Sequence, residues 1–187
     1  SLMEDWNYKI EAIINETVNE NVTSLAGVPS WMLVLLNKIL KESKKEYISE
    51  IWPNLEVYFH GGVSFKPYLN QYDAIINKNS MQYYEIYNAS EGFFAIQYEN
   101  NSNELLLMLD YGIFYEFIPM KTYGTKNEKI IPLNEVEKDL NYAILITTNA
   151  GLWRYKIGDT IKFTSLNPYK IVVSGRTKHF INVFGEE

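Results

Sequence analysis

Cysteine is absent from the 187 residues, which excludes disulfide bridges and thiolate chemistry and fits a reducing compartment. Long apolar runs are also lacking. The longest, Trp31–Leu36, is far below the ~20 residues that a membrane-spanning helix needs. The first residues lack the basic start and apolar stretch of a signal peptide. We therefore expect a cytoplasmic protein that does not enter a membrane.

An excess of positive charge is lacking too. The 17 basic residues are outnumbered by 23 acidic ones, which gives a net charge of −6 and no electrostatic footprint for nucleic acid. The chain does have enough apolar residues for a hydrophobic core, since 47% of its residues are hydrophobic and 15% are aromatic. Its length suits one large domain or part of a larger one. Composition alone thus predicts a globular domain without a nucleic-acid partner.

The two ends of the chain suggest a piece of a longer protein. Ser1 and Leu2 precede Met3, as a remnant of an expression vector would. At the other end, Gly185-Glu-Glu187 follows an apolar run directly, with no helix or capping sequence.

The front half alternates between helical and strand-like patterns. Ser30 is a plausible N-cap of its second helix. The expected elements are a helix within 4–20, a helix over 31–46, a strand over 55–59, a helix over 65–77 and a strand over 81–87. Strand–helix–strand alternation predicts a parallel sheet.

The rear half consists of short β-branched or aromatic runs, with a clear turn at Asn100-Asn-Ser-Asn103. Strands are expected over 93–98, 104–109, 113–119, 142–148, 160–165 and 169–174, with one helical turn near Ile131–Asn134. The fold class is therefore α/β: a parallel-sheet part over about 1–92, followed by a strand-rich, mostly antiparallel part over about 93–175.

The segment Tyr87-Asn-Ala-Ser-Glu91-Gly92 follows a buried strand, at the edge where ligands of parallel sheets bind. The carboxylate of Glu91 would suit Mg²⁺, which prefers oxygen ligands, and Tyr87 would stack on a base. Gly92 would relieve the turn. Taken alone, the same hexapeptide is also what an ordinary strand-to-strand turn looks like.

Two later segments place charged groups beside glycines. Asp159 follows Gly158 and precedes an expected strand, where its carboxylate could accept hydrogen bonds from the two hydroxyls of a ribose. Arg176 follows Gly175 at the end of the last expected strand and could pair with a phosphate or a ribose. Taken alone, Gly158-Asp159 is typical of a common Gly-Asp turn, and Arg176 is typical of an ordinary surface arginine.

A glycine pair, Gly61-Gly62, follows His60 at the end of another expected strand. Glycines there permit close approach of a flat ring such as adenine, although such pairs also mark plain turns. His179, the other histidine, is by default an exposed side chain rather than a ligand or a base.

Together, and in this order, the segments resemble the nucleotide-binding motifs of adenylate-forming enzymes. The resemblance narrows to the acyl-acid amido synthetases, the auxin-responsive or Gretchen Hagen family, and their bacterial relatives. Three segments carry it: Tyr87-Asn-Ala-Ser-Glu91, Tyr155-Lys-Ile-Gly-Asp159 and Ser24-Leu-Ala-Gly27-Val-Pro29-Ser-Trp31. The second has lysine where the family motif has arginine. The similarity covers nearly the whole chain, which would then be a fragment of the large N-terminal domain.

This resemblance implies an ATP- and Mg²⁺-dependent ligase that activates a carboxylic acid and passes the acyl group to an amine, usually an amino acid. The implied nucleotide-binding residues are Gly61, Gly62, Tyr87, Ser90, Glu91, Asp159 and Arg176. Glu91 would lie at the metal and Arg176 near the ribose. Lys178 would lie at the domain hinge, which with the start of the next domain would occupy 176–187. Trp31, Phe93 and Phe94 are candidates for an apolar acyl pocket, and each is at least as compatible with ordinary core.

Two parts of the family's site are not found. No Ser/Thr/Gly-rich phosphate loop occurs in residues 1–60, and the catalytic lysine belongs to a C-terminal domain that would begin near residue 187. We therefore expect no catalytic residue in this fragment and no useful activity from it alone. Two alternatives remain open: an acyl-CoA ligase of the same superfamily, and a non-catalytic module whose 15 tyrosines and 4 tryptophans line a ligand groove.

Overall fold

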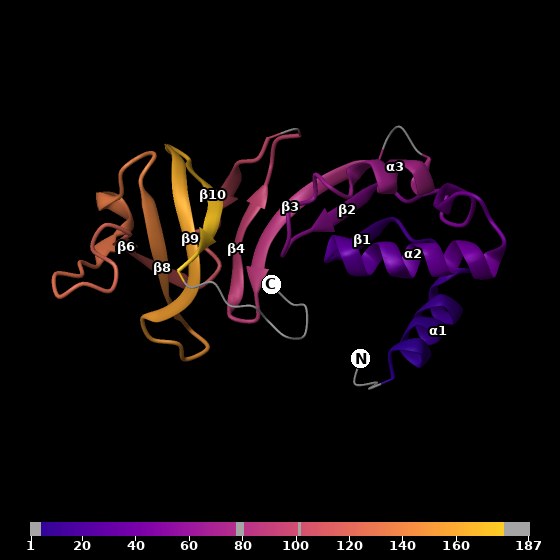
Figure 1. The fold of residues 1–187 in the computed structure, drawn as a ribbon, viewed down its shortest axis with the longest axis horizontal. Helices are drawn as coiled ribbons and strands as arrows, with labels where there is room; N and C mark the ends of the chain where they lie inside the picture. Colours follow the sequence, from indigo (N-terminus) through magenta and orange to yellow (C-terminus); the bar gives the residue numbers. More distant parts are fainter. Residues whose placement is uncertain (1–4, 78–80, 101, 178–187) are drawn as a thin grey trace. The chain divides into compact units, whose positions relative to one another are not determined.

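The computed structural model describes residues 5–77, 81–100 and 102–177 (Figure 1). The chain divides into two compact units, Ser1–Glu85 and Ile86–Glu187. The division falls inside one long strand, β3 (Gln82–Ala89), which contributes its first half to one unit and its second half to the other. None of the helices in the described ranges is long and apolar enough to cross a membrane.

The first unit is an α/β structure with a small parallel sheet. Its other elements are α1 (Trp6–Thr17), β1 (Ser24–Gly27), α2 (Pro29–Ser43), the 3-10 helix η1 (Ile48–Glu50), β2 (Val57–His60) and α3 (Leu69–Ile76). β1 pairs with β2 and β2 pairs with the first half of β3, both in parallel. Leu36, Ile39, Leu55, Tyr58 and Tyr72 are fully buried and form the centre of its core. The parallel sheet predicted from the alternating pattern is confirmed.

Two local expectations for this unit are wrong. α2 begins at Pro29 with Val28 as its N-cap, so Ser30 lies within the helix instead of capping it. Proline fits the first helical position because its missing N–H would have no intrahelical partner there. The strand β1 was not expected, because only one of its four residues, Leu25, is buried and no alternating pattern marks it.

The second unit is antiparallel in every strand pair of its described residues. Its strand order is β3-β4-β5-β10-β9-β8-β6-β7. Besides the end of β3, the elements are β4 (Gly92–Gln97), β5 (Leu105–Leu107), β6 (Ile113–Pro119), β7 (Ile131–Pro132), the 3-10 helix η2 (Leu133–Glu135), β8 (Asn141–Thr148), β9 (Tyr155–Leu166) and β10 (Tyr169–Arg176). The antiparallel rear half and the helical turn near residue 133 agree with the sequence prediction.

β9 differs most from expectation. It begins at Tyr155 instead of residue 160 and runs for 12 residues. Asp159 therefore lies inside a strand, and its predicted placement in a turn before a strand is wrong. Gly158, which the sequence suggested as a turn, is accommodated within the strand at a φ of +96°.

Candidate functional site

Three of the predicted site residues meet in the second unit. The hydroxyl of Tyr87, near the end of β3, donates a hydrogen bond of 2.8 Å to Oδ2 of Asp159 in β9. Nε of Arg176, the last residue of β10, lies 3.1 Å from the other carboxylate oxygen, Oδ1. Asp159 is only 8% exposed, whereas the Arg176 side chain is half exposed. Strands β3, β9 and β10 thus assemble a buried carboxylate with one neutral and one charged donor.

Register shifts on both sides of β9 surround Asp159. On one side of β9, Ala143 of β8 faces Thr160 while Leu145 faces Lys156, so that Gly158 and its neighbours form a bulge. On the other side, the register between β9 and β10 shifts between Lys170 and Ile171 and shifts back between Val173 and Gly175, so that Arg176 faces Asp159. Bulges are common beside active sites because they re-aim side chains.

Glycine is required at the bulge of β9. A φ of +96° is strained for any residue that has a Cβ atom. The carbonyl of Gly158 accepts hydrogen bonds from the Thr177 backbone N–H at 2.7 Å and from its hydroxyl at 3.1 Å. These bonds tie the end of β10 to the bulge that carries Asp159.

The environment of Tyr87 favours its neutral, hydrogen-bond-donating form. Burial raises the pKa of its phenol, and the negative charge of Asp159 raises it further. The tyrosine therefore stays protonated and donates to the carboxylate. Because a carboxylate offers about four acceptor positions, Asp159 retains capacity for further donors such as a pair of ligand hydroxyls.

Ser90 and Glu91 form the tight turn between β3 and β4, where Ala89 faces Gly92. Ser90 is exposed and Glu91 half-buried. The carboxylate of Glu91 interacts with the hydroxyl of Tyr155, the first residue of β9, and this interaction raises the pKa of that phenol. Tyr155 was missed as a contact of Glu91, although it opens the motif that ends at Asp159.

Gly92 follows the turn without a special backbone conformation. Its φ is not in the left-handed region, so relief of the turn does not require glycine there. A Cβ atom at this position would lie 2.8 Å from Cδ1 of Ile113 in β6, so the end of the isoleucine side chain would have to shift.

A magnesium ion fits Glu91 only together with a nucleotide. In the described part of the chain, no three His, Asp or Glu side chains gather as metal ligands. Mg²⁺, however, is usually held by one or two carboxylates together with substrate phosphates and waters. A half-buried carboxylate at a turn fits that donor set, with the phosphates supplying the other ligands.

The glycine pair lies in the first unit, directly after β2. Gly61 is buried, and Gly62 has a φ of +84°, which favours glycine. The preceding His60 is 3% exposed, stacks on Phe65 with ring centroids 4.1 Å apart, and its Nδ1 has no hydrogen-bond partner among the described residues. Burial lowers the pKa of His60 to about 4. The imidazole is therefore neutral at pH 7.

The three candidates for an acyl pocket have different surroundings. Trp31 is 47% exposed and packs edge-on against Trp6 in the first unit. Phe93 is half-buried beside Tyr111 in the second. Phe94 has no exposed surface and belongs to the core of that unit, so it offers no face to a ligand in this conformation. The expected hinge residue Lys178 lies outside the described residues.

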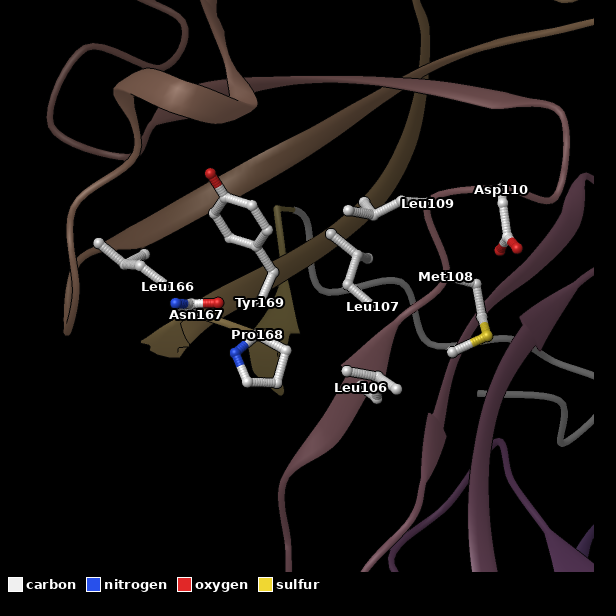
Figure 2. Close-up of a pocket in the computed structure, with 9 residues that line it drawn as sticks. All are labelled: Leu106, Leu107, Met108, Leu109, Asp110, Leu166, Asn167, Pro168 and Tyr169. Carbon is white, nitrogen blue, oxygen red and sulfur yellow. The ribbon is translucent and has the colours of Figure 1, made fainter.

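A shallow cavity of about 370 Å³ lies elsewhere in the second unit (Figure 2). Its lining is mostly apolar and comprises Leu106, Leu107, Met108, Leu109, Asp110, Leu166, Asn167, Pro168 and Tyr169. Figure 2 shows the carboxylate of Asp110 and the amide of Asn167 on opposite sides of this apolar set. None of the predicted site residues lines it.

Two domains of one known family match this chain. Residues 1–81 match the GH3 family N-terminal domain, and residues 106–176 match the GH3 family central domain. The chain belongs to the GH3 family. Among its GH3 relatives, indole-3-acetic acid-amido synthetase GH3.4 of Arabidopsis thaliana is 28% identical over 171 residues, which are 83% of this chain and 27% of the relative. The rice protein named probable indole-3-acetic acid-amido synthetase GH3.11 is 22% identical over 173 residues, which cover 82% of this chain and 26% of the relative.

Solved structures with the same fold include a GH3 protein and a CoA ligase. The AtGH3.15 acyl acid amido synthetase in complex with 2,4-DB superposes with a TM-score of 0.66 at 15% identity, over 93% of this chain and 39% of that one. A 2-hydroxyisobutyryl-CoA ligase in complex with 2-HIB-AMP and CoA gives a TM-score of 0.59 at 15% identity, over 95% and 40% of the two chains. The α/β fold of adenylate-forming enzymes is thereby confirmed. This GH3 chain spans about a quarter of the length of the curated relatives above.

Proposed function

We propose that these 187 residues belong to an ATP-dependent ligase that activates a carboxylic acid as its acyl-adenylate and transfers the acyl group to an amine, an amino acid in particular. The observation that carries the proposal is the buried carboxylate of Asp159, held between Tyr87 and Arg176 at the end of the Tyr155–Asp159 motif. The names of the GH3 relatives support the choice of acceptor, since they are amido synthetases.

In this proposal, Asp159 accepts hydrogen bonds from the two ribose hydroxyls, and Arg176 lies near the ribose. Tyr87 and Ser90 surround the base and the phosphates. The half-exposed Arg176 can follow the ligand, because its guanidinium is not enclosed by the protein. These residues hold the nucleotide in place for a reaction at its α-phosphate.

The reaction has two steps. An oxygen of the acid's carboxylate bonds to the α-phosphorus of ATP while the bond to pyrophosphate breaks. The amine then attacks the acyl carbonyl, AMP leaves, and the amine loses a proton. When bound through Glu91, Mg²⁺ would neutralise charge on the phosphates. What this chain's residues supply is alignment, which lowers the entropic barrier between two anionic reactants.

The test is a pyrophosphate-exchange assay followed by product analysis. A full-length protein that contains these residues should exchange labelled pyrophosphate into ATP in the presence of its carboxylic acid and should form an amide with amino acids. Formation of a thioester with coenzyme A instead would replace the proposal by the acyl-CoA ligase alternative. Absence of exchange with a broad panel of aliphatic and aromatic acids would contradict both.

The 187-residue chain alone should bind adenosine nucleotides without exchanging pyrophosphate. Residues 1–187 contain neither the Ser/Thr/Gly-rich loop before the glycine pair nor the lysine-bearing domain that the family uses at the phosphates. Exchange above background by this chain would show that its own residues complete the chemistry. The assay needs only the chain, ATP, Mg²⁺, labelled pyrophosphate and the acid.

A further inference from the structure

Two hydroxyl groups bind β9 on either side of Asp159. The Thr177 hydroxyl donates a hydrogen bond of 3.1 Å to the carbonyl oxygen of Gly158, the residue before Asp159. The Ser174 hydroxyl donates one of 3.0 Å to Oγ1 of Thr160, the residue after it. The carboxylate-bearing residue is thus fastened at both of its neighbours by side chains from the end of β10 and the residue that follows it.

The bond from Thr177 fixes the peptide unit that leads into Asp159. The carbonyl of Gly158 and the N–H and Cα atoms of Asp159 lie in one peptide plane, so the direction of the carbonyl sets the direction of the chain at Asp159. Glycine has more backbone freedom than any other residue, and Gly158 has a φ of +96°. The Thr177 backbone N–H already binds this carbonyl at 2.7 Å, and the hydroxyl takes the second acceptor position. Two donors restrict rotation of the peptide more than one donor would.

The direction of the Asp159 carboxylate matters because several donors use it. Tyr87 donates to one oxygen and Arg176 lies beside the other, so the acceptor positions left for ribose hydroxyls are those that these two side chains do not occupy. Hydrogen bonds weaken steeply once their angle falls toward about 120°. A rotation of the peptide before Asp159 would therefore weaken the bonds from a ribose.

We propose that Thr177 is a positioning residue for the ribose of an adenosine nucleotide: its hydroxyl holds the Gly158–Asp159 peptide so that the carboxylate faces the two ribose hydroxyls. Thr177 acts on the nucleotide only through Gly158 and Asp159. This inference rests on the proposed ribose-binding role of Asp159. Serine would serve at this position, whereas valine, which has the shape of threonine without its hydroxyl, would not.

The test is calorimetric titration of the 187-residue chain and its variants with AMP and with 2′,3′-dideoxy-AMP, which lacks the ribose hydroxyls. Thr177→Val should weaken AMP binding about 3- to 10-fold, as expected for one hydrogen bond, and leave the binding of 2′,3′-dideoxy-AMP within about twofold of the wild type. Thr177→Ser should bind AMP within about twofold of the wild type. A merely structural role would weaken the binding of both nucleotides alike.

A double-mutant cycle with Asp159 tests whether Thr177 acts through the carboxylate. In the Asp159→Asn background the charged acceptor is gone, so adding Thr177→Val should change the dissociation constant of AMP less than about twofold. Residues that act through one another show such non-additivity, whereas independent residues have additive effects.

Thr122→Val is the matched control. The Thr122 hydroxyl also donates to a backbone carbonyl at 3.1 Å, that of Pro119, and it lies in the turn after β6. It accepts a further hydrogen bond of 3.4 Å from the Lys129 backbone N–H, so its removal should cost at least as much stability as that of the Thr177 hydroxyl. Urea unfolding should show a loss of stability in both valine variants, and only Thr177→Val should lose affinity for AMP.

Three results would overturn the inference about Thr177: an unchanged AMP affinity in Thr177→Val, an equal loss of affinity for the two nucleotides, or an equal loss in both Asp159 backgrounds. In each case Asp159→Asn tells the two proposals apart. If it lowers the preference for AMP over 2′,3′-dideoxy-AMP, the ribose role stands and only this inference fails. If AMP does not bind the wild type, or binds it without dependence on Asp159, the ribose role and this inference fail together.

Discussion

The carboxylate of Asp159 is a buried charge that depends on its donors. A buried carboxylate without partners costs far more free energy than an exposed ion pair contributes. The hydrogen bond from Tyr87 and the ion pair with the partly exposed Arg176 together offset that cost for Asp159. A ligand that brings two further hydroxyl donors to the same carboxylate would therefore gain from a site that is already formed.

His60 allows a test of burial at the level of one residue. Its pKa is about 4 in the folded protein against an ordinary value of 6.5, so protons bind the unfolded chain preferentially. The contribution of the neutral His60 to the free energy of unfolding is fully present above pH 6.5 and is lost as the pH drops toward 4. Between pH 7.5 and pH 5 the free energy of unfolding should fall by about 2 kcal/mol more in the wild type than in His60→Phe.

Urea denaturation at the two pH values measures this difference. His179→Asn, which removes the other histidine of the sequence, should retain the wild-type dependence. Identical pH dependence in the wild type and His60→Phe would mean that His60 is as solvated in the folded protein as in the unfolded chain.

Among the secondary-structure elements, β9 decides the geometry of the site. Its bulge at Gly158 directly precedes Asp159, and two shifts that cancel in the β9–β10 ladder leave Arg176 opposite Asp159. The strand continues through the bulge at Gly158 because glycine adopts a positive φ without strain.

Replacing Gly158 by alanine should cost about 1–2 kcal/mol in unfolding free energy, the price of a Cβ atom at positive φ. It should also weaken AMP binding, because the bulge that aims Asp159 would change. Gly151→Ala is the control, since Gly151 has a φ of +103° in the loop before β9 and no atom within 4 Å of an added Cβ. Both variants should lose stability, and only Gly158→Ala should lose affinity. Equal AMP affinities would contradict the role of the bulge.

At the scale of the whole molecule, the sequence predicted the division into a parallel α/β part and an antiparallel part. Periodicity and turn residues suffice for that, because they are local. It did not predict β1, which has a single buried side chain, or the start of β9, where a glycine within a strand looks like a turn. Whether such residues form a strand is decided by their pairing with strands that are distant in the sequence.

Pairing between distant strands also brings together Tyr87, Asp159 and Arg176. Only the resemblance of whole motifs to those of adenylate-forming enzymes suggested that these residues meet. The sequence therefore indicated which residues gather at the site, and the structure is needed to show how they are supported.

The central claim is that Asp159 binds the two hydroxyls of an adenosine ribose. The most direct measurement compares AMP with 2′,3′-dideoxy-AMP by calorimetry on the wild type and on Asp159→Asn. The wild type should prefer AMP by roughly tenfold or more, as expected for hydrogen bonds to a charged acceptor, and the variant should lose most of that preference. Equal binding of the two nucleotides to the wild type, or an undiminished preference in the variant, would contradict the claim.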